Sequence, residues 1–536
     1  MLQHAAHRPM LQSGALSALS VAVHGARLRI SPTWTIRATR RSYAVAGARV
    51  RASARTGSPR WTRASSTATE TNTGTTKPKR SSTPQLIGLG LISGAVGYGL
   101  AYWRRDGTPG KGKIPRLASE PVDIASLVDS PVDGGSFQQA DAKLREDVFV
   151  GSFNAENTNP HVHAARVASN HPVEDTMAFS LAPGVGKSET LFNGVFDGHA
   201  GWATSLLLKK ALIPAVSSQI TQLPPSTPDE AINSAIVKAF TSLDELIFSN
   251  AKKAVDGLEA GTYEPGDSRV VAAIAPAIAG SCALLSVFDP AALTIRVACT
   301  GDSRAVLGSL AKGAASYSSL ELSKDQTGFN QDECDRLAKE HPGEEGMIDP
   351  KTGRLFGIAV TRAFGDHRWK WTTDFIKHVH ENFWGTTPRP KTVTPPYMTA
   401  APVVTSTKVE APDFVILASD GLWDHISSEH AVECVAQWIA AKKAGKQMPK
   451  DKLAADPGVR SKFDMEGGWP SWLATPADFV IEDLDNAAVH LIKNALGGNR
   501  RTLFTGATLA YAPLARSVRD DVTVQVIFFQ DPARAN

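Results

Sequence analysis

Apolar residues between positions 160 and 530 follow two alternating patterns. Short runs rich in Val, Ile, Phe and Leu end at Gly, Asp, Asn or Ser, which is typical of β-strands. Longer stretches repeat an apolar residue every three or four positions, as one face of an α-helix does. The short runs predict strands at residues 176–181, 191–196, 281–288, 294–299, 305–307, 414–418 and 522–529.

Two helices have clear N-terminal signals. The segment TPDE at 227–230 predicts an N-cap, a first-turn proline and a capping-box glutamate. Ile232 and Phe240 follow it at helical spacing and predict a face that packs in the core. A second helix is predicted from Asn330 and must end before Pro342.

The predicted elements favour an α+β fold. Hairpins between strands, with helices in groups, indicate a sandwich of two mainly antiparallel β-sheets flanked by helices. We assign residues 159–532 to this domain and find no internal repeat. Residues 251–279, 367–400 and 436–515 are predicted to be insertions or long loops.

The first hundred residues have a different composition. Eleven arginines lie between Arg8 and Arg63, and no acidic residue precedes Glu70. This composition is typical of a mitochondrial transit peptide, and the segment RRSYA at 40–44 resembles a processing site of matrix-targeted precursors. We therefore predict a transit peptide at 1–43. The alternative is a disordered basic tail that binds nucleic acid.

A low-complexity linker at 44–85 leads to the uncharged apolar segment 86–103, which has basic residues at both ends. Its length just spans a bilayer, and its aromatic residues suit the membrane interface. We predict a transmembrane segment that would anchor the protein in the inner membrane, although such glycine-rich stretches also occur as linkers. The nearly equal flanking charges leave the side of the membrane open. Residues 104–158 are predicted to be a connector.

The formal charge of +4 is unevenly distributed. Residues 1–113 hold 18 of the 57 basic residues and two of the 53 acidic ones, so the rest of the chain has a net charge of −12. Nucleic acid is therefore not expected as a partner, because binding to phosphate needs basic clusters. An excess of carboxylates suits hard cations instead. The four cysteines show no CxxC spacing, so neither a zinc knuckle nor a redox pair is predicted.

Acidic residues stand at the ends of several predicted strands. They are Glu174, Asp175, Asp197, Asp302, Asp420, Asp424, Asp520 and Asp521. A single Asp-Gly after a strand is most often just a turn. If several of these strand ends converge, however, mutual repulsion would require neutralising cations. Oxygen ligands indicate Mg²⁺ or Mn²⁺ rather than zinc.

Five sequence blocks carry a family resemblance. They are FNGVFDGHAGWA, VACTGDSRAVLG, RLFGIAVTRAFGDHRWKW, DFVILASDGLWDHIS and SVRDDVTVQVIFF. The sequences of these blocks and their order along the chain resemble those of the metal-dependent protein phosphatase 2C family over residues 160–530. The resemblance implies an enzyme that hydrolyses phosphoserine and phosphothreonine on a phosphoprotein with metal-activated water.

The resemblance also implies metal ligands. Asp197 would bridge two ions, Mg²⁺ or Mn²⁺, with Glu174 and the carbonyl of Gly198 as ligands of one ion. Asp420 and Asp520 would hold the other ion.

Further roles follow from the same resemblance. Asp302 and Asp424, with Asp420, resemble a third and weaker metal site. Asp175 would orient the attacking water from behind the metal ligands. His199 would be the general acid that protonates the departing serine or threonine oxygen.

One position departs from the usual family pattern. Asn170 stands four residues before Glu174, where the family usually has an arginine that binds the substrate phosphate. Arg166 is a candidate replacement, and the alternative reading of Arg166 is a surface arginine. Ala200 stands where a glycine is common.

The asparagine indicates a branch of the family. Together with the segments KEHPGEE and PPYMTAAPVV, it resembles the pyruvate dehydrogenase phosphatase branch, which agrees with the leader. This implies the E1α subunit of pyruvate dehydrogenase as the substrate. The alternatives are other mitochondrial phosphoproteins or a non-catalytic binding module, and the retained ligand residues argue against the latter.

Overall fold

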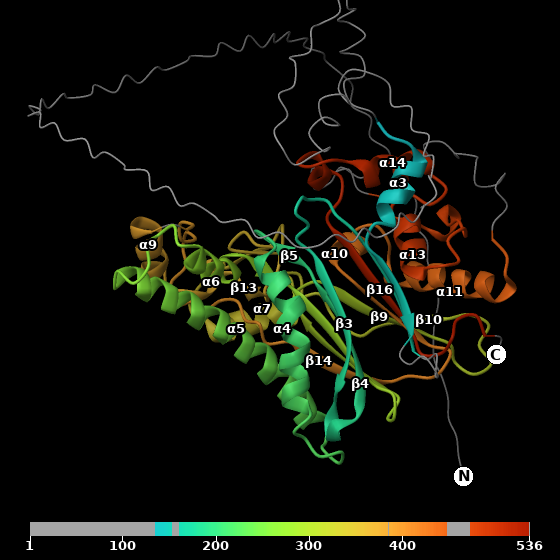
Figure 1. Ribbon diagram of the computed structural model, residues 1–536, viewed down its shortest axis with the longest axis horizontal. Helices are drawn as coiled ribbons and strands as arrows, with labels where there is room; N and C mark the ends of the chain where they lie inside the picture. The colour runs from blue at the N-terminus through green and yellow to red at the C-terminus, as the bar shows by residue number, and fades with distance from the viewer. Residues whose placement is uncertain (1–133, 153–159, 384, 448–471, 535–536) are drawn as a thin grey trace, which may run out of the picture. The chain divides into compact units, whose positions relative to one another are not determined.

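A computed structural model describes residues 134–152, 160–383, 385–447 and 472–534. Two antiparallel sheets pack between layers of helices (Figure 1), which confirms the predicted α+β sandwich. The first sheet has, in spatial order, β1 (Val148–Ser152), β2 (His161–Val167), β16 (Val522–Phe528), β15 (Phe414–Ala418), β9 (Arg304–Ser309) and β10 (Ser318–Glu321). The second has β14 (Val403–Lys408), β8 (Thr294–Thr300), β7 (Ala283–Asp289), β4 (Glu189–Phe196) and β3 (Thr176–Pro183).

Short strands extend this framework near the ends of the long ones. A small third sheet has the order β13 (Phe364–Gly365), β6 (Gly280–Ser281) and β5 (Gly198–His199). A separate hairpin pairs β11 (Ile348–Asp349) with β12 (Arg354–Leu355). Every strand predicted from the sequence is present, as β3, β4, β7, β8, β9, β15 and β16.

Helices cover the outer faces of both sheets (Figure 1). Those on the second sheet are α4 (Ala203–Ile220) and α5 (Asp229–Glu259), and α6 (Ser268–Ile278) packs on these two helices. Those on the first sheet are α3 (Phe137–Leu144), α11 (Ser428–Ala444) and α13 (Ala487–Ala495), and α14 (Arg501–Leu509) packs on α3. The remaining α-helices of the described residues are α7 (Gln331–Glu340), α8 (His367–Lys370), α9 (Thr373–Asn382) and α10 (Asp420–Trp423).

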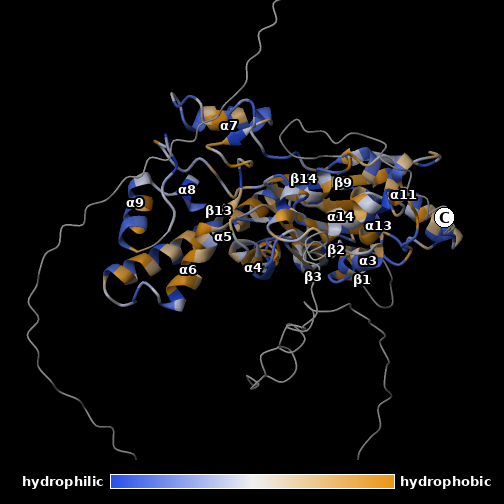
Figure 2. Cartoon of the chain, turned by 90° about the horizontal axis from the view of Figure 1, so that it is seen from above, coloured by the Kyte–Doolittle hydropathy of each residue, from blue (hydrophilic) through white to orange (hydrophobic). Residues whose placement is uncertain are grey.

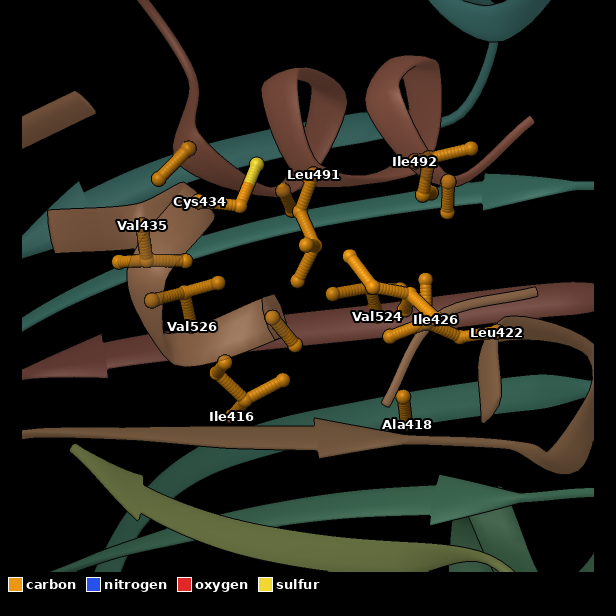
Figure 3. Packing of buried hydrophobic residues seen from close by; sticks show 14 of the residues in the cluster. Ile416, Ala418, Leu422, Ile426, Cys434, Val435, Leu491, Ile492, Val524 and Val526 are labelled. Atoms are coloured by element: carbon orange, nitrogen blue, oxygen red, sulfur yellow. The ribbon is translucent and has the colours of Figure 1, made fainter. Parts of the chain in front are cut away.

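Strand β15 shows how the sequence pattern builds the core. Phe414 and Ile416 point to the helices of the first sheet, whereas Val415 and Leu417 point to the second sheet. Successive side chains of a strand face opposite ways, so a continuous apolar run buries both faces. Figure 3 shows the helix side of this core, where β15 and β16 meet α11 and α13. Each fully buried large side chain contributes about 1.5–3 kcal/mol to stability.

The structure differs from prediction in the segments expected to be insertions or loops. Residues 251–279 are mostly helical, because α5 continues to Glu259 and α6 follows it. Residues 367–400 contain α8 and α9, and 436–515 contain the end of α11 with α13 and α14. Alanine-rich apolar stretches such as AVHLIKNA become helices here because the outer face of a sheet is available to bury them.

Two boundaries also differ from expectation. Helix α5, predicted to start with Thr227 as its N-cap, has Pro228 at that position instead. No side chain of the described residues caps the helix by a hydrogen bond. Part of the expected connector 104–158 is folded, since α3 packs on α14 and β1 pairs with β2. No helix among the described residues is long and apolar enough to cross a membrane. The predicted transit peptide and transmembrane segment lie outside the described residues.

Candidate active site

Three aspartates from separate strand ends form the centre of the site. Asp197 follows β4, Asp302 lies in the turn between β8 and β9, and Asp420 follows β15. One carboxylate oxygen from each lies within 4.8 Å of the others. The predicted convergence of strand ends is therefore present for these three residues.

The cluster is electrostatically unfavourable by itself. Burial and the nearby carboxylates of Asp420, Asp175 and Asp302 raise the pKa of Asp197 well above its ordinary value. Burial and Asp420 likewise raise the pKa of Asp302 to about 7. The Oδ1 atom of Asp420 is buried and has no hydrogen-bond partner among the described residues. Crowded carboxylates with a free oxygen fit a hard divalent cation, which relieves both the repulsion and the missing contact.

Two glycines allow the ends of neighbouring strands to lie in close main-chain contact. A Cβ atom on Gly198 would lie 2.2 Å from the main-chain oxygen of Glu174, and one on Gly421 would lie 2.0 Å from that of Asp521. Neither position has room for a side chain. Close backbone packing therefore requires glycine at 198 and 421, so these Asp-Gly pairs are more than ordinary turns.

Asp521 is a site residue to which the sequence assigned no role. Its Oδ1 accepts hydrogen bonds from the main-chain N–H groups of Ser169 and Asn170 and from the Ser169 hydroxyl. Its Oδ2 accepts from the main-chain N–H groups of Glu174 and Asp175, at 2.9 and 3.2 Å. One buried carboxylate thus fixes both ends of the 169–175 segment to the start of β16. The only sequence signal was its position beside Asp520.

Glu174 itself is oriented by two neighbours. Its Oε1 accepts the main-chain N–H of Gly201 at 2.6 Å, and its Oε2 accepts from Nδ2 of Asn170 at 3.2 Å. Asn170, the departure from the family pattern, therefore contacts an expected metal ligand. The candidate Arg166 is held elsewhere, because it donates to Asp147 and to the main-chain oxygen of Asp175.

The other expected acidic residues lie around the cluster. Asp520 ion-pairs with Arg516 and accepts the main-chain N–H of Asp521 at 2.6 Å. Asp424 is exposed one helical turn beyond Asp420. Asp175 is buried and accepts the Thr523 hydroxyl at 2.7 Å. Burial and the Asp521 carboxylate raise the pKa of Asp175 to about 7.

His199 is paired with an acid from a distant part of the chain. Its Nε2 lies 2.6 Å from Oδ2 of Asp366, which is buried just after β13. Burial opposes protonation of this imidazole, but the Asp366 carboxylate outweighs it and raises the pKa of His199. A raised pKa favours the protonated imidazole, which is suited to donate a proton. Asp366 lies within the family block RLFGIAVTRAFGDHRWKW, but the resemblance assigned it no role.

Backbone conformation explains why a glycine is common at position 200, where this chain has an alanine. Ala200, next to His199, has a φ angle of +56°, in the left-handed region that glycine adopts most easily. Asp366 also has a positive φ, of +60°. Aspartate is enriched in that region, whereas an alanine there costs about 1–2 kcal/mol.

Comparisons with known proteins identify the family of this chain. The family model of protein phosphatase 2C matches residues 163–458. A protein phosphatase 2C homologue of Schizosaccharomyces pombe is 38% identical over 378 residues, which cover 68% of this chain and 79% of the relative.

Two further relatives are named mitochondrial pyruvate dehydrogenase (acetyl-transferring) phosphatase 1. The Saccharomyces cerevisiae protein is 35% identical over 405 residues, covering 68% of each chain. The Homo sapiens protein is 29% identical over 423 residues, covering 68% of this chain and 76% of the relative.

The fold and the carboxylate cluster, together with these similarities, define a metal-dependent protein serine/threonine phosphatase. The chain belongs to the protein phosphatase 2C family, as the sequence blocks predicted. It is accordingly a hydrolase of phosphoproteins.

Proposed function

We propose that this phosphatase acts in mitochondria on the E1α subunit of pyruvate dehydrogenase and uses Mg²⁺ or Mn²⁺. The observation that carries the proposal is the cluster of Asp197, Asp302 and Asp420, because three converging carboxylates with a free buried oxygen suit such ions. The names of the relatives in Saccharomyces cerevisiae and Homo sapiens support the substrate. The basic leader and those same names support the location.

In this proposal the ion ligands are those implied by the family resemblance. Asp197, Glu174, the Gly198 carbonyl, Asp420 and Asp520 would hold the ions. Asp302 and Asp424, with Asp420, make up a third and weaker site. When bound, divalent cations would neutralise the carboxylates and would supply a nucleophilic water at neutral pH.

The remaining chemistry belongs to the protein's own residues. Asp175, held by the Thr523 hydroxyl, orients the attacking water. His199, whose pKa Asp366 raises, donates a proton from its imidazole to the departing serine or threonine oxygen. Such an alkoxide is a poor leaving group, and general acids typically contribute about 10²–10⁴-fold to the rate.

The organisation of the chain is part of the same proposal. A transit peptide at 1–43 is removed on import, and a linker at 44–85 precedes the apolar segment 86–103. The connector 104–158, of which α3 and β1 already belong to the fold, leads to the rest of the phosphatase domain at 159–532. Segment 86–103 would anchor the domain at the inner membrane. If it does not insert, the enzyme lies free in the matrix.

The chemistry is tested first with a purified enzyme. Asp197→Asn should abolish hydrolysis of p-nitrophenyl phosphate. EDTA should abolish the activity of the wild type, and addition of Mn²⁺ or Mg²⁺ should restore it. Asp256→Asn is the matched control, because Asp256 is exposed on α5 and pairs only with Lys252 among the described residues. Full activity in EDTA would contradict the metal mechanism.

The substrate is tested in cells. Deletion of the gene should raise serine phosphorylation of E1α and lower pyruvate dehydrogenase flux, and the Asp197→Asn protein should rescue neither. Unchanged E1α phosphorylation, with a rise at other mitochondrial phosphosites, would favour the alternative of the same chemistry on other phosphoproteins.

A further inference from the structure

Two arginine side chains lie together beside α8 without an anionic partner. Arg368 belongs to α8, and Arg389 lies in the loop that follows α9. The guanidinium carbons lie 6.0 Å (Arg368) and 4.5 Å (Arg389) from the ring centroid of Trp369. Both side chains are half-buried, and both Nε atoms are buried without a hydrogen-bond partner in the part of the chain that the structure describes.

This arrangement is unusual among the arginines of the described ranges. Arg362 donates to Glu333, and Arg304 donates to Asp325. The buried Arg519 has main-chain oxygens of Ala507 and Ala168 as acceptors. The described arginines that are buried or half-buried, other than the pair at α8, likewise have a carboxylate within 4.0 Å or a main-chain acceptor.

The pair carries uncompensated positive charge. Burial and the neighbouring Arg389 lower the pKa of Arg368, and burial also lowers the pKa of Arg389. Guanidinium groups nonetheless stay protonated in proteins, so two cations that repel each other lie half-buried beside the same tryptophan ring. Repulsion of this kind is relieved when an anion binds to them.

The local structure holds the two side chains in place. Trp369 is buried, and its indole Nε1 donates to the main-chain oxygen of Leu355 at 3.0 Å. The loop with Arg389 is tied to α8 by a hydrogen bond of 2.9 Å between Thr386 Oγ1 and His367 Nε2. The pair is therefore organised before any ligand arrives, which reduces the entropy lost on binding.

The pair lies on the side of the proposed proton donor. Asp366, whose carboxylate contacts His199, comes two residues before Arg368, and its charge partly offsets the burial that lowers the pKa of Arg389. Figure 2 shows α8 between α9 and β13, the strand that ends next to Asp366. Because His199 already occupies Asp366, that carboxylate does not neutralise both arginines. A substrate bound at His199 would pass close to them.

We propose that Arg368 and Arg389 form an oxyanion site that binds an acidic side chain of the phosphoprotein substrate, near the phosphoserine that is hydrolysed. This inference rests on the proposed function. Guanidinium groups match carboxylate and phosphate with paired N–H donors, so either a Glu or Asp side chain or a second phosphate fits the site. Residues 114–536, which include the domain, have a net charge of −12 and repel acidic segments at long range. The arginine pair would select one acidic position locally.

The test uses the purified phosphatase with Mn²⁺ and a series of phosphoserine peptides. A single glutamate is moved stepwise along a neutral peptide, in parallel with a second phosphoserine at the same positions. We expect the wild type to prefer one position, with kcat/KM about tenfold above the neutral peptide. The double change Arg368→Gln and Arg389→Gln should reduce this ratio to near one, through KM rather than kcat.

Matched variants separate charge from geometry. Arg269→Gln removes an exposed arginine of α6 and should keep the wild-type ratio. Arg389→Lys keeps the charge but loses the paired donors, so the ratio should fall only part of the way. Circular dichroism confirms folding of each variant, and Arg389→Lys serves if the double variant does not fold.

The outcomes distinguish the inference from the proposed function. Two results would overturn the oxyanion site and leave the phosphatase assignment standing. In the first, the wild type hydrolyses all peptides with the same kcat/KM. In the second, it prefers one acidic position, and the arginine changes leave that preference unaltered. Selectivity for phosphoserine over glutamate would identify a second phosphate as the ligand, and the reverse would identify a carboxylate. A wild type that hydrolyses no peptide overturns the proposed function and this inference with it.

Discussion

Asp521 offers a sharp test of how the site is built. Its buried carboxylate accepts four main-chain N–H groups and one hydroxyl, all from residues 169–175. Asp521→Ala would leave these donors without their acceptor. A stranded buried donor costs about 1–3 kcal/mol, and water entering the small cavity would satisfy some of the five. We therefore expect Asp521→Ala to lower the free energy of unfolding by about 3–5 kcal/mol.

The same change should weaken metal binding. The N–H groups of Glu174 and Asp175 are two of the donors, so loss of Asp521 frees the backbone that positions an expected ligand. Urea unfolding measures the stability, and Mn²⁺ titration of p-nitrophenyl phosphate hydrolysis measures the apparent metal affinity. We expect the Mn²⁺ concentration for half-activation to rise about tenfold or more, with a smaller fall in kcat at saturating Mn²⁺.

Two controls complete this experiment. Asp521→Asn keeps one acceptor oxygen, so it should lose about half as much stability as Asp521→Ala. Asp256→Ala removes an exposed carboxylate and should change the unfolding free energy by less than about 0.5 kcal/mol. A stability for Asp521→Ala within about 1 kcal/mol of the wild type would refute the reasoning, because it would show that the five contacts do not hold the segment.

Three further changes have defined outcomes. His199→Ala should slow alkyl phosphates about 10²–10⁴-fold and aryl phosphates much less, and equal losses would mean that His199 is not the general acid. Glu333→Gln should destabilise the protein by about 3–5 kcal/mol at pH 7. Arg362 holds the pKa of Glu333 below its ordinary value of 4.5 against the effect of burial, so this difference should shrink in urea unfolding as the pH falls below 4.5. Ala200→Gly should stabilise by about 1 kcal/mol in the same assay, because φ there is positive, and a loss would contradict this.

The sequence by itself determined the strands and the types of residue at their ends. Strand prediction succeeded because alternation and apolar runs are local properties, and β15 shows both of its faces buried as that pattern requires. The family blocks likewise pointed to Asp197 and Asp420, which the structure brings into one cluster, because each stands in a motif of a few contiguous residues. The role of His199 stays a prediction. Helices such as α6 and α13 were missed, because their apolar residues form a buried helix face only when the neighbouring helices and sheet are in place.

Only the tertiary structure decided which side chains meet. Asp366 lies 167 residues from His199 and Asp521 lies about 350 residues from the segment that it holds, so no local spacing could pair them. The isolation of Arg368 and Arg389 is likewise a property of three dimensions, because it depends on where every other carboxylate lies. Periodicity records burial along one element, whereas electrostatic contacts depend on distances between elements that the packing of the two sheets fixes.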